Sequence, residues 1–270
     1  MKPILSRIIS IREEGKDRKT ITVLNKQIAR NAIPGQFIMV WIPGVDEIPM
    51  GISYIGGEEI AFTVHRVGEA TAALHEMKVN DCIGIRGPYG RGFKEVNGRI
   101  IIIGGGTGMA PLMPLVRRLI EKRENKVTVI NGAKSVDEMI YRDELNKLMS
   151  EGRIRYIPAT EDGSLGYHGL ATDALEELLN EDEKPDEIYV CGPEVMIKKV
   201  MEIALKKQVH MQAAIERYIK CAIGVCGSCA VDPIGLRVCV EGPVIPLEIL
   251  TKISELGMYK REASGAKIKI

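Results

Sequence analysis

The sequence predicts a β + α/β protein with an N-terminal antiparallel β-barrel, a doubly wound parallel-sheet nucleotide domain and a small C-terminal cysteine-rich subdomain. Three observations lead to this prediction. Short β-rich segments with frequent turns fill residues 1–97, strands alternate with helical segments over residues 98–211, and four cysteines fall within residues 212–250. Closely spaced short strands are typical of small barrels, whereas alternating strands and helices are typical of parallel βαβ units.

The barrel strands are expected from apolar residues that alternate with polar ones, as in half-buried strands. The strands expected there include Thr20–Asn25, Gly35–Pro43 and Glu59–Val67. One segment departs from this pattern, because Ala70–Met77 ("ATAALHEM") favours a short helix. A run of short strands with almost no helical periodicity therefore predicts a barrel.

The nucleotide domain is expected from Gly98 onward, where apolar strands alternate with amphipathic helices. "RIIIIGGG" predicts a buried strand that leads through glycines into a helix, and "KVTVING" and "IRYIPAT" predict two further strands. Helices are expected over Ser135–Gly152, which has an acidic start and a glycine stop, and near Thr172–Leu179. For residues 251–270 we expect a helix and a loose tail.

Composition limits the classes of function. The chain has 270 residues, of which 45% are hydrophobic and 27% charged, and its net charge is +1. With neither charge sign in excess and only 4% aromatic residues, we expect no nucleic-acid and no membrane partner. The N-terminal residues lack the apolar core of a signal peptide, and no apolar run reaches the roughly 20 residues of a membrane span. We therefore expect a cytoplasmic protein.

The cysteine pattern is the most specific motif. Cys221, Cys226, Cys229 and Cys239 follow the spacing Cys-x4-Cys-x2-Cys-x9-Cys, which matches the plant-type ligand order for a [2Fe–2S] cluster. Small residues between them would let backbone N–H groups approach the sulfur atoms. Zinc is an alternative, although it usually takes two Cys-x2-Cys pairs. Structural disulfides are a further alternative, which a cytoplasmic compartment disfavours.

Two turns that each join a strand to a helix predict a dinucleotide site. "IIIIGGGTGMAPL" ends a strand in glycines that let the backbone approach a phosphate at a helix N-terminus, although a tight turn alone would also explain them. "VCGPEVM" ends a second strand, and "TEDGSLGYHG", otherwise a polar surface loop, should reach the same sheet edge. The expected dinucleotide-binding residues are Gly104, Gly105, Gly106, Thr107, Gly108, Pro111, Thr160, Glu161, Asp162, Cys191, Gly192, Pro193, Glu194 and Met196.

The same loops predict the type of dinucleotide. Glu161 and Asp162 would repel a 2′-phosphate, and only Lys134 follows the second strand, so we expect NAD rather than NADP. Cys191 is expected at the mouth of the cleft near the nicotinamide, with packing beneath the turn as the alternative. Cys82 is expected to be a buried small apolar residue. We assign catalysis to none of the four histidines, and no general acid–base pair is evident.

The order of the motifs resembles that of the ferredoxin–NADP reductase superfamily. Within it, "ERYIKCAIGVCGSC" and "LRVCVEGPV" are similar to the iron–sulfur electron-transfer subunits of dihydroorotate dehydrogenase B, and the resemblance covers roughly residues 4–246. The cysteine spacing and "CGPEVM" are its specific parts. The resemblance implies that the barrel binds FAD and that electrons pass between NAD(H), FAD and a [2Fe–2S] cluster.

The resemblance also implies where FAD binds. The family has an Arg-Pro-x-Ser turn, and the corresponding "IPMGISY" keeps Ser53, expected near flavin N5, but has Met50 and Gly51 in place of Arg and Pro. "HRVGEAT" corresponds to a second family segment, in which Arg66 is the expected partner of the FAD phosphates. "GPYGRGF" resembles the family turn under the flavin. The implied FAD contacts are Ser53, His65, Arg66, Gly68, Thr71, Gly87, Tyr89 and Gly90.

The resemblance implies that the chain is one half of an enzyme. A flavin can accept a hydride and release electrons singly, so it belongs between a nicotinamide and a one-electron cluster. The implied partner is an FMN-containing dihydroorotate dehydrogenase catalytic subunit of pyrimidine biosynthesis, in a two-plus-two heterotetramer. The apolar residues Ala222, Ile223 and Val225 suit either a docking face or the subdomain's own core.

Two other functions stay open. The first is a related diaphorase-type subunit of a hydrogenase, a sulfur reductase or a ferredoxin-linked transhydrogenase. The second, of another class, is a zinc-stabilised regulatory or scaffold protein, which the missing Arg-Pro turn would suit.

Overall fold

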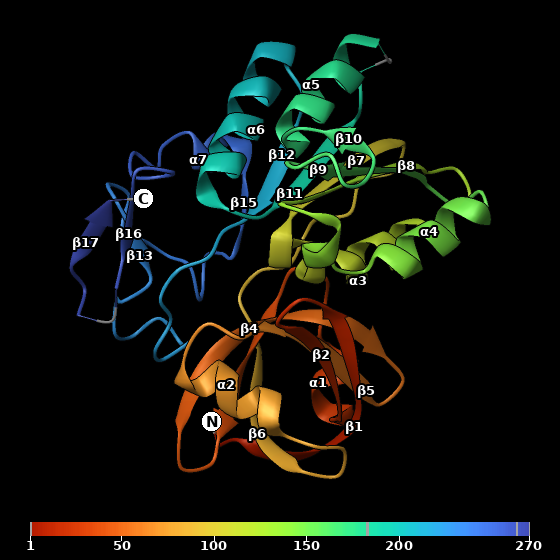
Figure 1. Ribbon diagram of the computed structural model, residues 1–270. Helices are drawn as coiled ribbons and strands as arrows, with labels where there is room; N and C mark the ends of the chain where they lie inside the picture. Colours follow the sequence, from red (N-terminus) through yellow and green to blue (C-terminus); the bar gives the residue numbers. More distant parts are fainter. Residues whose placement is uncertain (1, 182–183, 263, 270) are drawn as a thin grey trace.

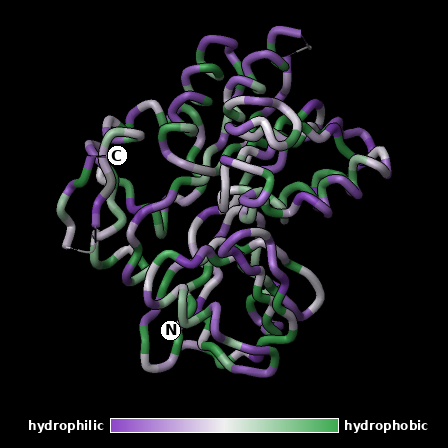
Figure 2. Tube along the Cα trace, in the orientation of Figure 1, coloured by the Kyte–Doolittle hydropathy of each residue, from purple (hydrophilic) through white to green (hydrophobic). Residues whose placement is uncertain are grey.

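The computed structural model describes residues 2–181, 184–262 and 264–269. Figure 1 shows a barrel, a layered α/β domain and a smaller C-terminal part beside both. Apolar residues concentrate along the strands and inner helix faces, and hydrophilic residues follow the outer helices and loops (Figure 2). Three buried apolar clusters correspond to these layers, one in the barrel and one on each face of the central sheet. The expected β + α/β architecture is confirmed.

Six antiparallel strands form the closed barrel. They are β1 (Ile4–Gly15), β2 (Arg18–Leu24), β3 (Phe37–Ile42), β4 (Asp46–Gly56), β5 (Glu59–His65) and β6 (Cys82–Tyr89), closed in the order β1-β2-β5-β4-β3-β6. Successive residues of a strand face opposite sides, so Ile21 and Val23 of β2 lie in the barrel core, completely buried. The short helices α1 (Lys26–Asn31) and α2 (Glu69–Glu76) lie in the connections between strands.

The same alternation corrects the expectation for Cys82. Cys82 is exposed at the start of β6, whereas Ile83 and Ile85 are completely buried in the barrel core. The two isoleucines occupy the inner face, and Gly84 on the outer face is covered by Trp41 of β3. The strand period therefore turns the Cys82 side chain outward.

A seven-stranded sheet forms the centre of the nucleotide domain. Its strands, in spatial order, are β10 (Tyr167–His168), β9 (Arg155–Thr160), β8 (Lys126–Ala133), β7 (Arg99–Gly105), β11 (Glu187–Cys191), β12 (Met211–Ala214) and β15 (Val244–Pro246). All neighbouring pairs are parallel except β12 with β15. The expected boundary at residue 212 therefore falls inside a sheet strand, and the cysteine-rich segment is an excursion between β12 and β15.

Helices cover both faces of this sheet, as a doubly wound fold requires. The helical segments are η1 (Gly106–Gly108), α3 (Met109–Leu119), η2 (Val136–Glu138), α4 (Arg142–Ser150), α5 (Ala171–Glu181) and α6 (Glu194–Lys207). Helices α3 and α4 contribute to the buried cluster that contains Ile100 and Ile102 of β7, and α5 and α6 contribute to the cluster on the opposite face, which contains Ile101 and Ile103. No helix among the described residues is long and apolar enough to cross a membrane.

The helix expected over Ser135–Gly152 is interrupted. It consists of the short η2 and of α4, which are separated by residues 139–141, and Tyr141, the last of these, has φ 57°. This left-handed conformation is rare for a residue with a side chain. Tertiary packing maintains it, because the Tyr141 hydroxyl inserts against the barrel, 2.6 Å from Thr63 Oγ1.

The C-terminal part also differs from expectation. The short strands β13 (Ala230–Val231) and β14 (Leu236–Arg237) pair within the cysteine-rich excursion, and α7 (Leu247–Leu250) ends before residue 251. Instead of the expected helix and loose tail, the segment beyond it makes turns and a hairpin of β16 (Tyr259–Arg261) and β17 (Lys267–Lys269). The alternation of charged and apolar residues over Lys267–Lys269 suits a strand better than a helix.

Candidate functional site

A cleft of about 1150 Å³ opens at the carboxyl ends of the parallel strands. We call it the sheet-edge cleft. Arg18 and His65 line it from the barrel, so it lies where the barrel meets the nucleotide domain. The residues predicted from sequence that line it are His65, Gly105, Gly106, Thr107, Gly108, Glu161, Gly192, Pro193, Glu194 and Met196.

Two glycine-containing turns meet at the floor of the cleft. A side chain at Gly108 would overlap the backbone carbonyl of Cys191, and one at Gly105 would overlap a methionine sulfur of α6. Gly106 has φ +54° and faces open space, a conformation that glycine adopts without strain. The tight packing explains the glycines, and the open space at Gly106 fits a phosphate group beside the start of α3.

Cys191 does not reach the mouth of the cleft. It is 2% exposed and packs in the apolar cluster beneath the turn, together with Ala214 and Val244. Burial raises the pKa of its thiol well above the ordinary value. The structure therefore corresponds to the alternative interpretation, in which Cys191 packs under the turn and its neighbours Gly192 and Pro193 face the cleft.

Only some of the polar residues in the loop after β9 line the sheet-edge cleft. Thr160 Oγ1 donates to the Leu165 carbonyl at 2.8 Å, and the Asp162 carboxylate accepts from the N–H and hydroxyl of Ser164 at 2.9 and 2.6 Å. These hydrogen bonds with Ser164 lower the pKa of Asp162. Thr160 and Asp162 thus shape the loop, while Glu161 between them lines the cleft.

The segment expected to hold FAD phosphates forms the start of α2. Thr71 Oγ1 accepts from the N–H groups of Val67 and Gly68, both at 2.9 Å, so it caps the helix. Arg66 lies just before it with a half-exposed side chain, 3.5 Å from Glu76. A helix N-terminus beside an accessible arginine suits a diphosphate, so this part of the barrel fits FAD, although it lies outside the sheet-edge cleft lining.

Ser53 lies beneath α3 and is completely buried. Its carbonyl accepts from Arg117 Nη1 at 2.7 Å. The Tyr141 phenol lies beside the Ser53 hydroxyl. Among the described residues, however, no group makes a hydrogen bond of normal distance and angle with this hydroxyl. Gly51 on the same strand approaches Pro111 of α3. The structure does not bring Ser53 to the cleft lining, and its place at flavin N5 stays a prediction.

The turn that contains Gly87, Tyr89 and Gly90 contacts the cysteine-rich excursion. Arg91 N–H donates to the Gly242 carbonyl at 2.5 Å, and a side chain at Gly90 would overlap the ring of Pro243. This turn therefore joins the barrel to the segment that follows Cys239. Its expected position under a flavin remains a prediction.

Several cleft residues were not predicted to line a site, although three of them, Glu216, Arg217 and Tyr218, begin the motif "ERYIKCAIGVCGSC". The residues not predicted are Arg18, Glu138, Lys199, Glu216, Arg217, Tyr218, Arg261 and Ile268, among others. Arg18 reaches the cleft because β2 pairs with β5, which sets Arg18 opposite His65. Burial and Arg18 lower the pKa of His65. Glu216 and Tyr218 directly follow the strand region that leads to the cysteines, and this position, together with the motif, could have indicated them.

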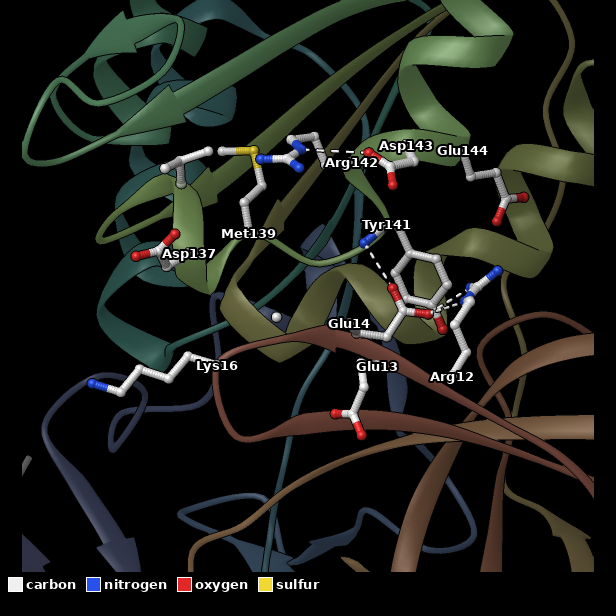
Figure 3. Close-up of a pocket in the computed structure, with 12 residues that line it drawn as sticks. Arg12, Glu13, Glu14, Lys16, Asp137, Met139, Tyr141, Arg142, Asp143 and Glu144 are labelled. Atoms are coloured by element: carbon white, nitrogen blue, oxygen red, sulfur yellow. Dashed lines mark hydrogen bonds and ion pairs between the residues drawn. The ribbon is translucent and has the colours of Figure 1, made fainter. Parts of the chain in front are cut away.

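A second crevice, of about 480 Å³, marks the contact between the barrel and the nucleotide domain (Figure 3). Glu14 is buried there and accepts from Arg12 Nε at 2.6 Å, from Thr20 Oγ1 at 2.9 Å and from the Tyr141 N–H at 3.2 Å. Figure 3 shows the Glu14 carboxylate between the Arg12 guanidinium and the Tyr141 N–H, so this buried carboxylate is hydrogen-bonded from both domains.

Tyr141 joins the two domains at this place. Its hydroxyl lies 2.6 Å from Thr63 Oγ1 and 3.2 Å from Thr20 Oγ1, and burial raises its pKa. Arg18 of the barrel also pairs with Glu138 of η2 at 2.9 Å. We call these contacts the barrel junction. Buried and mutually hydrogen-bonded, they fix one domain against the other.

The four cysteines fall into two pairs. The thiols of Cys221 and Cys226 interact with each other, and so do the thiols of Cys229 and Cys239. The backbone N–H of Cys239 also donates to Cys229 Sγ at 3.4 Å. Among the described residues, no three Cys, His, Asp or Glu side chains are grouped to hold one metal ion. Two pairs fit two irons with two thiolates each better than they fit a single tetrahedral zinc.

The surroundings of the two pairs differ. Burial acts against ionisation of Cys221, but the N–H groups of Cys226, Ile223 and Val225 lower the pKa of its thiol to about 6. Burial and the neighbouring Cys229 raise the pKa of Cys239 to about 12. The first pair is therefore wrapped by backbone donors, which also stabilise a negatively charged cluster.

Sequence profiles of two known families match the chain. Residues 102–202 match an oxidoreductase NAD-binding domain, and residues 216–251 match the iron–sulfur cluster binding domain of dihydroorotate dehydrogenase B. A solved chain of an NADH-dependent reduced ferredoxin–NADP oxidoreductase, studied for flavin-based electron bifurcation, is similar with a TM-score of 0.81 and 26% identity, over 93% of this chain and 94% of that one.

The FAD/NAD-binding domain of nitric oxide dioxygenase from Vibrio cholerae shares the fold alone, with a TM-score of 0.65 and 18% identity over 79% of this chain and 99% of that one. The fold and the site together define an NAD-linked flavin and iron–sulfur oxidoreductase subunit.

Several relatives carry the name "Probable dihydroorotate dehydrogenase B (NAD(+)), electron transfer subunit". The protein of Methanocaldococcus jannaschii is 43% identical over 99% of this chain and 98% of its own length. That of Methanocella arvoryzae is 42% identical over 100% of both. The chain belongs to the family of dihydroorotate dehydrogenase B electron transfer subunits, which confirms the resemblance found in the sequence.

Proposed function

We propose that the chain passes electrons between NAD(H), FAD and a [2Fe–2S] cluster, to or from an FMN-containing dihydroorotate dehydrogenase catalytic subunit in pyrimidine biosynthesis. The observation that carries the proposal is the presence, on one chain, of a cleft at the strand ends of an NAD-binding domain and of two cysteine pairs. A bound flavin converts a hydride into single electrons and so suits the step between them.

The chain's own residues would position the reactants. The open space at Gly106 and the start of α3 would hold the dinucleotide phosphates, and Arg66 with the start of α2 would hold the FAD phosphates. The barrel junction would then set the distance between the two rings, because Tyr141 and Glu14 fix the domains that carry them. Such fixed geometry accelerates a transfer between bound groups.

The two-iron cluster is tested by metal content. Anaerobically purified protein should contain two irons and two acid-labile sulfides per chain and give an EPR signal on reduction, because two thiolate pairs suit two irons. Stoichiometric zinc without sulfide would contradict the proposal and favour the scaffold alternative. Acid-released FAD would support the flavin, and FMN in its place would contradict it.

NAD is proposed over NADP because Glu161 lines the cleft and would repel a 2′-phosphate. The kcat/KM for NADH should exceed that for NADPH. Glu161→Gln should narrow the difference, whereas Glu151→Gln, on an exposed residue after α4, should leave it unchanged. A larger kcat/KM for NADPH in the unmodified chain would overturn the choice.

The partner is proposed to dock on the exposed residues of the ligand loop. Ile223 and Val225 are 56% and 79% exposed, next to the exposed Cys226, whereas Ala222 is buried in the core. The family membership supports a dihydroorotate dehydrogenase catalytic subunit as that partner, in a two-plus-two heterotetramer. A cytoplasmic complex is proposed because four of the six cysteines are assigned to a metal cluster, and clustered cysteines of this kind are typical of a reducing compartment.

Co-expression tests the partner. Alone, the chain should oxidise NADH with artificial dyes and leave orotate and dihydroorotate untouched. With the catalytic subunit, it should couple dihydroorotate oxidation to NAD reduction. Turnover of orotate by the isolated chain would contradict the proposal.

A transhydrogenase-type subunit is the second candidate, because the similar solved chain belongs to a ferredoxin–NADP oxidoreductase. Its 26% identity is lower than the 43% of the dihydroorotate dehydrogenase B relative, which favours the first proposal. Native pull-down distinguishes the two by the subunit that is recovered.

A further inference from the structure

The C-terminal segment is joined to the ligand loop by charge. We call it the strap, described over residues 251–262 and 264–269. Asp232 lies three residues beyond Cys229, and its Oδ2 accepts from Arg261 Nη2 at 2.7 Å and pairs with Lys267 Nζ at 2.8 Å. Lys267 Nζ is also 3.6 Å from Glu255 Oε2. The strap is therefore fastened to the cysteine-rich excursion.

The strap also reaches the sheet-edge cleft. Arg261 and Ile268 of its hairpin line the cleft wall. The Gly257 N–H donates to Glu194 Oε2 at 3.0 Å, and Glu194 begins α6 in the turn at the cleft floor. One segment thus touches both the predicted dinucleotide site and the ligand loop.

Arg217 completes this connection. Its side chain is 1% exposed, pairs with Glu194 through Nη1, and lies 3.6 Å from Glu255 Oε1 through Nη2. Glu255 itself is 4% exposed. Arg217 precedes Cys221 by four residues, and Tyr218 between them lines the cleft. Arg217 therefore ties the cleft floor to the backbone that enters the first cysteine pair.

The buried triad of Glu194, Arg217 and Glu255 is costly as a purely structural contact. Burying such ions is often no better for stability than an apolar trio of similar volume. Among the described groups, Arg217 Nε and Nη2 and both Glu255 oxygens also lack hydrogen bonds. Arg217 Nη1 donates to the carbonyl of its neighbour Glu216 at 2.8 Å and to Glu194. Glu194, at the cleft floor, is thus its one hydrogen-bonded side-chain partner among the described residues, and a change at Glu194 can move it.

We propose that Arg217 is a positioning residue that couples dinucleotide binding beside Glu194 to the Cys221–Cys226 half of the ligand loop, with the strap as its support. The proposal rests on the proposed function and extends it. Coupling between two sites is reciprocal. If reduction of the cluster changes the affinity for the dinucleotide by some factor, dinucleotide binding must change the reduction equilibrium of the cluster by the same factor.

Hydrogen–deuterium exchange tests the structural part. The probe is 1,4,5,6-tetrahydro-NAD, a dinucleotide that gives no hydride, added to the full chain with flavin and cluster bound. Amides in residues 218–229 should exchange at least fivefold more slowly with the probe than without it. Exchange that is unchanged there while residues 104–108 become protected would overturn the proposal.

The redox part uses an EPR-monitored titration of the cluster. The probe should change the one-electron reduction equilibrium at least fivefold, which is about 40 mV for a one-electron couple. Arg217→Met should reduce this to less than twofold, and Arg217→Lys, which keeps the charge, should restore part of it. Arg118→Met is the matched control, because it removes an ion pair at the surface, in which Arg118 Nε lies 2.8 Å from Glu95 Oε1. In this variant the probe should change the reduction equilibrium as much as it does in the unmodified chain.

A second variant covers failure of Arg217→Met to fold. A chain ending at Met258 lacks the hairpin that supports Glu255 and Asp232. In this variant the probe should shift the reduction potential of the cluster by no more than half of the shift measured in the unmodified chain. A full change in both variants would overturn the proposal. Failure of the proposed function has a different outcome, because a chain without flavin, sulfide or an EPR signal gives no titration at all.

Discussion

The barrel and the cysteine-rich excursion are attached to the nucleotide domain in different ways. At the barrel junction, the Tyr141 hydroxyl lies between Thr20 and Thr63, and Glu14 is hydrogen-bonded on several sides. At the excursion, Ile223 and Val225 around the first cysteine pair remain exposed. The first contact is buried and polar, and the second leaves its ligand loop open on one side.

The difference fits the two kinds of transfer that the proposed function requires, of a hydride inside the chain and of single electrons across its surface. A hydride passes only between rings held close together, so the domains that carry them need a fixed arrangement. Single electrons must cross between the chain and its partner, so the carrier needs a face that the partner can cover. Exposed apolar residues beside a buried support are what such a face requires.

The largest expected effect lies at the excursion and would separate the two attachments. Cys226→Ser should abolish the EPR signal and remove most of the iron and sulfide, because a hydroxyl is a poor ligand for the cluster. FAD content should stay within about 20% if the barrel junction is independent. Cys82→Ser is the control, since Cys82 is exposed on the barrel. Loss of flavin together with the cluster would contradict the separation.

The next effect concerns the open face. Val225→Glu should weaken binding of the catalytic subunit at least tenfold, because it places an unpaired charge in an apolar interface. Dye reduction by NADH should stay within twofold. Calorimetric titration of the two subunits measures the change, with Met149→Glu, 45% exposed on α4, as control. Equal losses in both variants would show that the ligand loop is not the docking face.

A smaller effect is expected at the barrel junction. Tyr141→Phe removes the hydroxyl that contacts Thr63 and Thr20, and should lower the free energy of unfolding by about 1–2 kcal/mol, because buried partners lose a hydrogen bond. Tyr167→Phe is the control. Its hydroxyl bonds Glu177 at 2.8 Å on the surface, so the change should be below about 0.5 kcal/mol. Denaturant titration measures both, and equal changes would contradict a buried, interlocked junction.

The smallest effect depends on pH and on the strap. Lys267 and Arg261 lower the pKa of Asp232. A carboxyl whose folded pKa is depressed adds stability above its unfolded pKa and loses it as pH falls through the folded value. The Tm difference between the unmodified chain and Asp232→Asn should therefore shrink from pH 6 to pH 3. Asp137→Asn, on an exposed residue of η2, is the control. A difference that grows on acidification would contradict the assigned ion pairs.

Much of the fold was available from sequence because its signals are local. Strand–helix alternation, the glycines after β7 and the cysteine spacing each lie within one continuous segment. The sheet then brings the ends of β7 and β11 together, as strand order in such folds requires. These signals placed Gly106, Glu161 and Glu194 at one cleft.

The remaining features depend on contacts between distant segments. Glu194, Arg217 and Glu255 meet only in three dimensions, and no spacing rule connects them. The orientation of Cys191 could not be predicted from the sequence either, because β11 is buried on both faces and its buried and exposed residues do not alternate. Tyr141 interrupts a helix that local propensity favours, since its contacts with the barrel outweigh that preference.

The pairing of β12 with β15 bears on how the cysteine-rich excursion can evolve. Ala214 of β12 pairs with Val244 of β15, so the chain departs from the sheet and rejoins it at adjacent points. Residues 215–243 are then an insertion whose two ends already touch, and joining those ends directly would need only a short turn. An insertion of this kind can be gained, exchanged or lost while the surrounding strands keep their pairing. A reductase and the part that exchanges electrons with its partner can in this way evolve as separable parts of one gene.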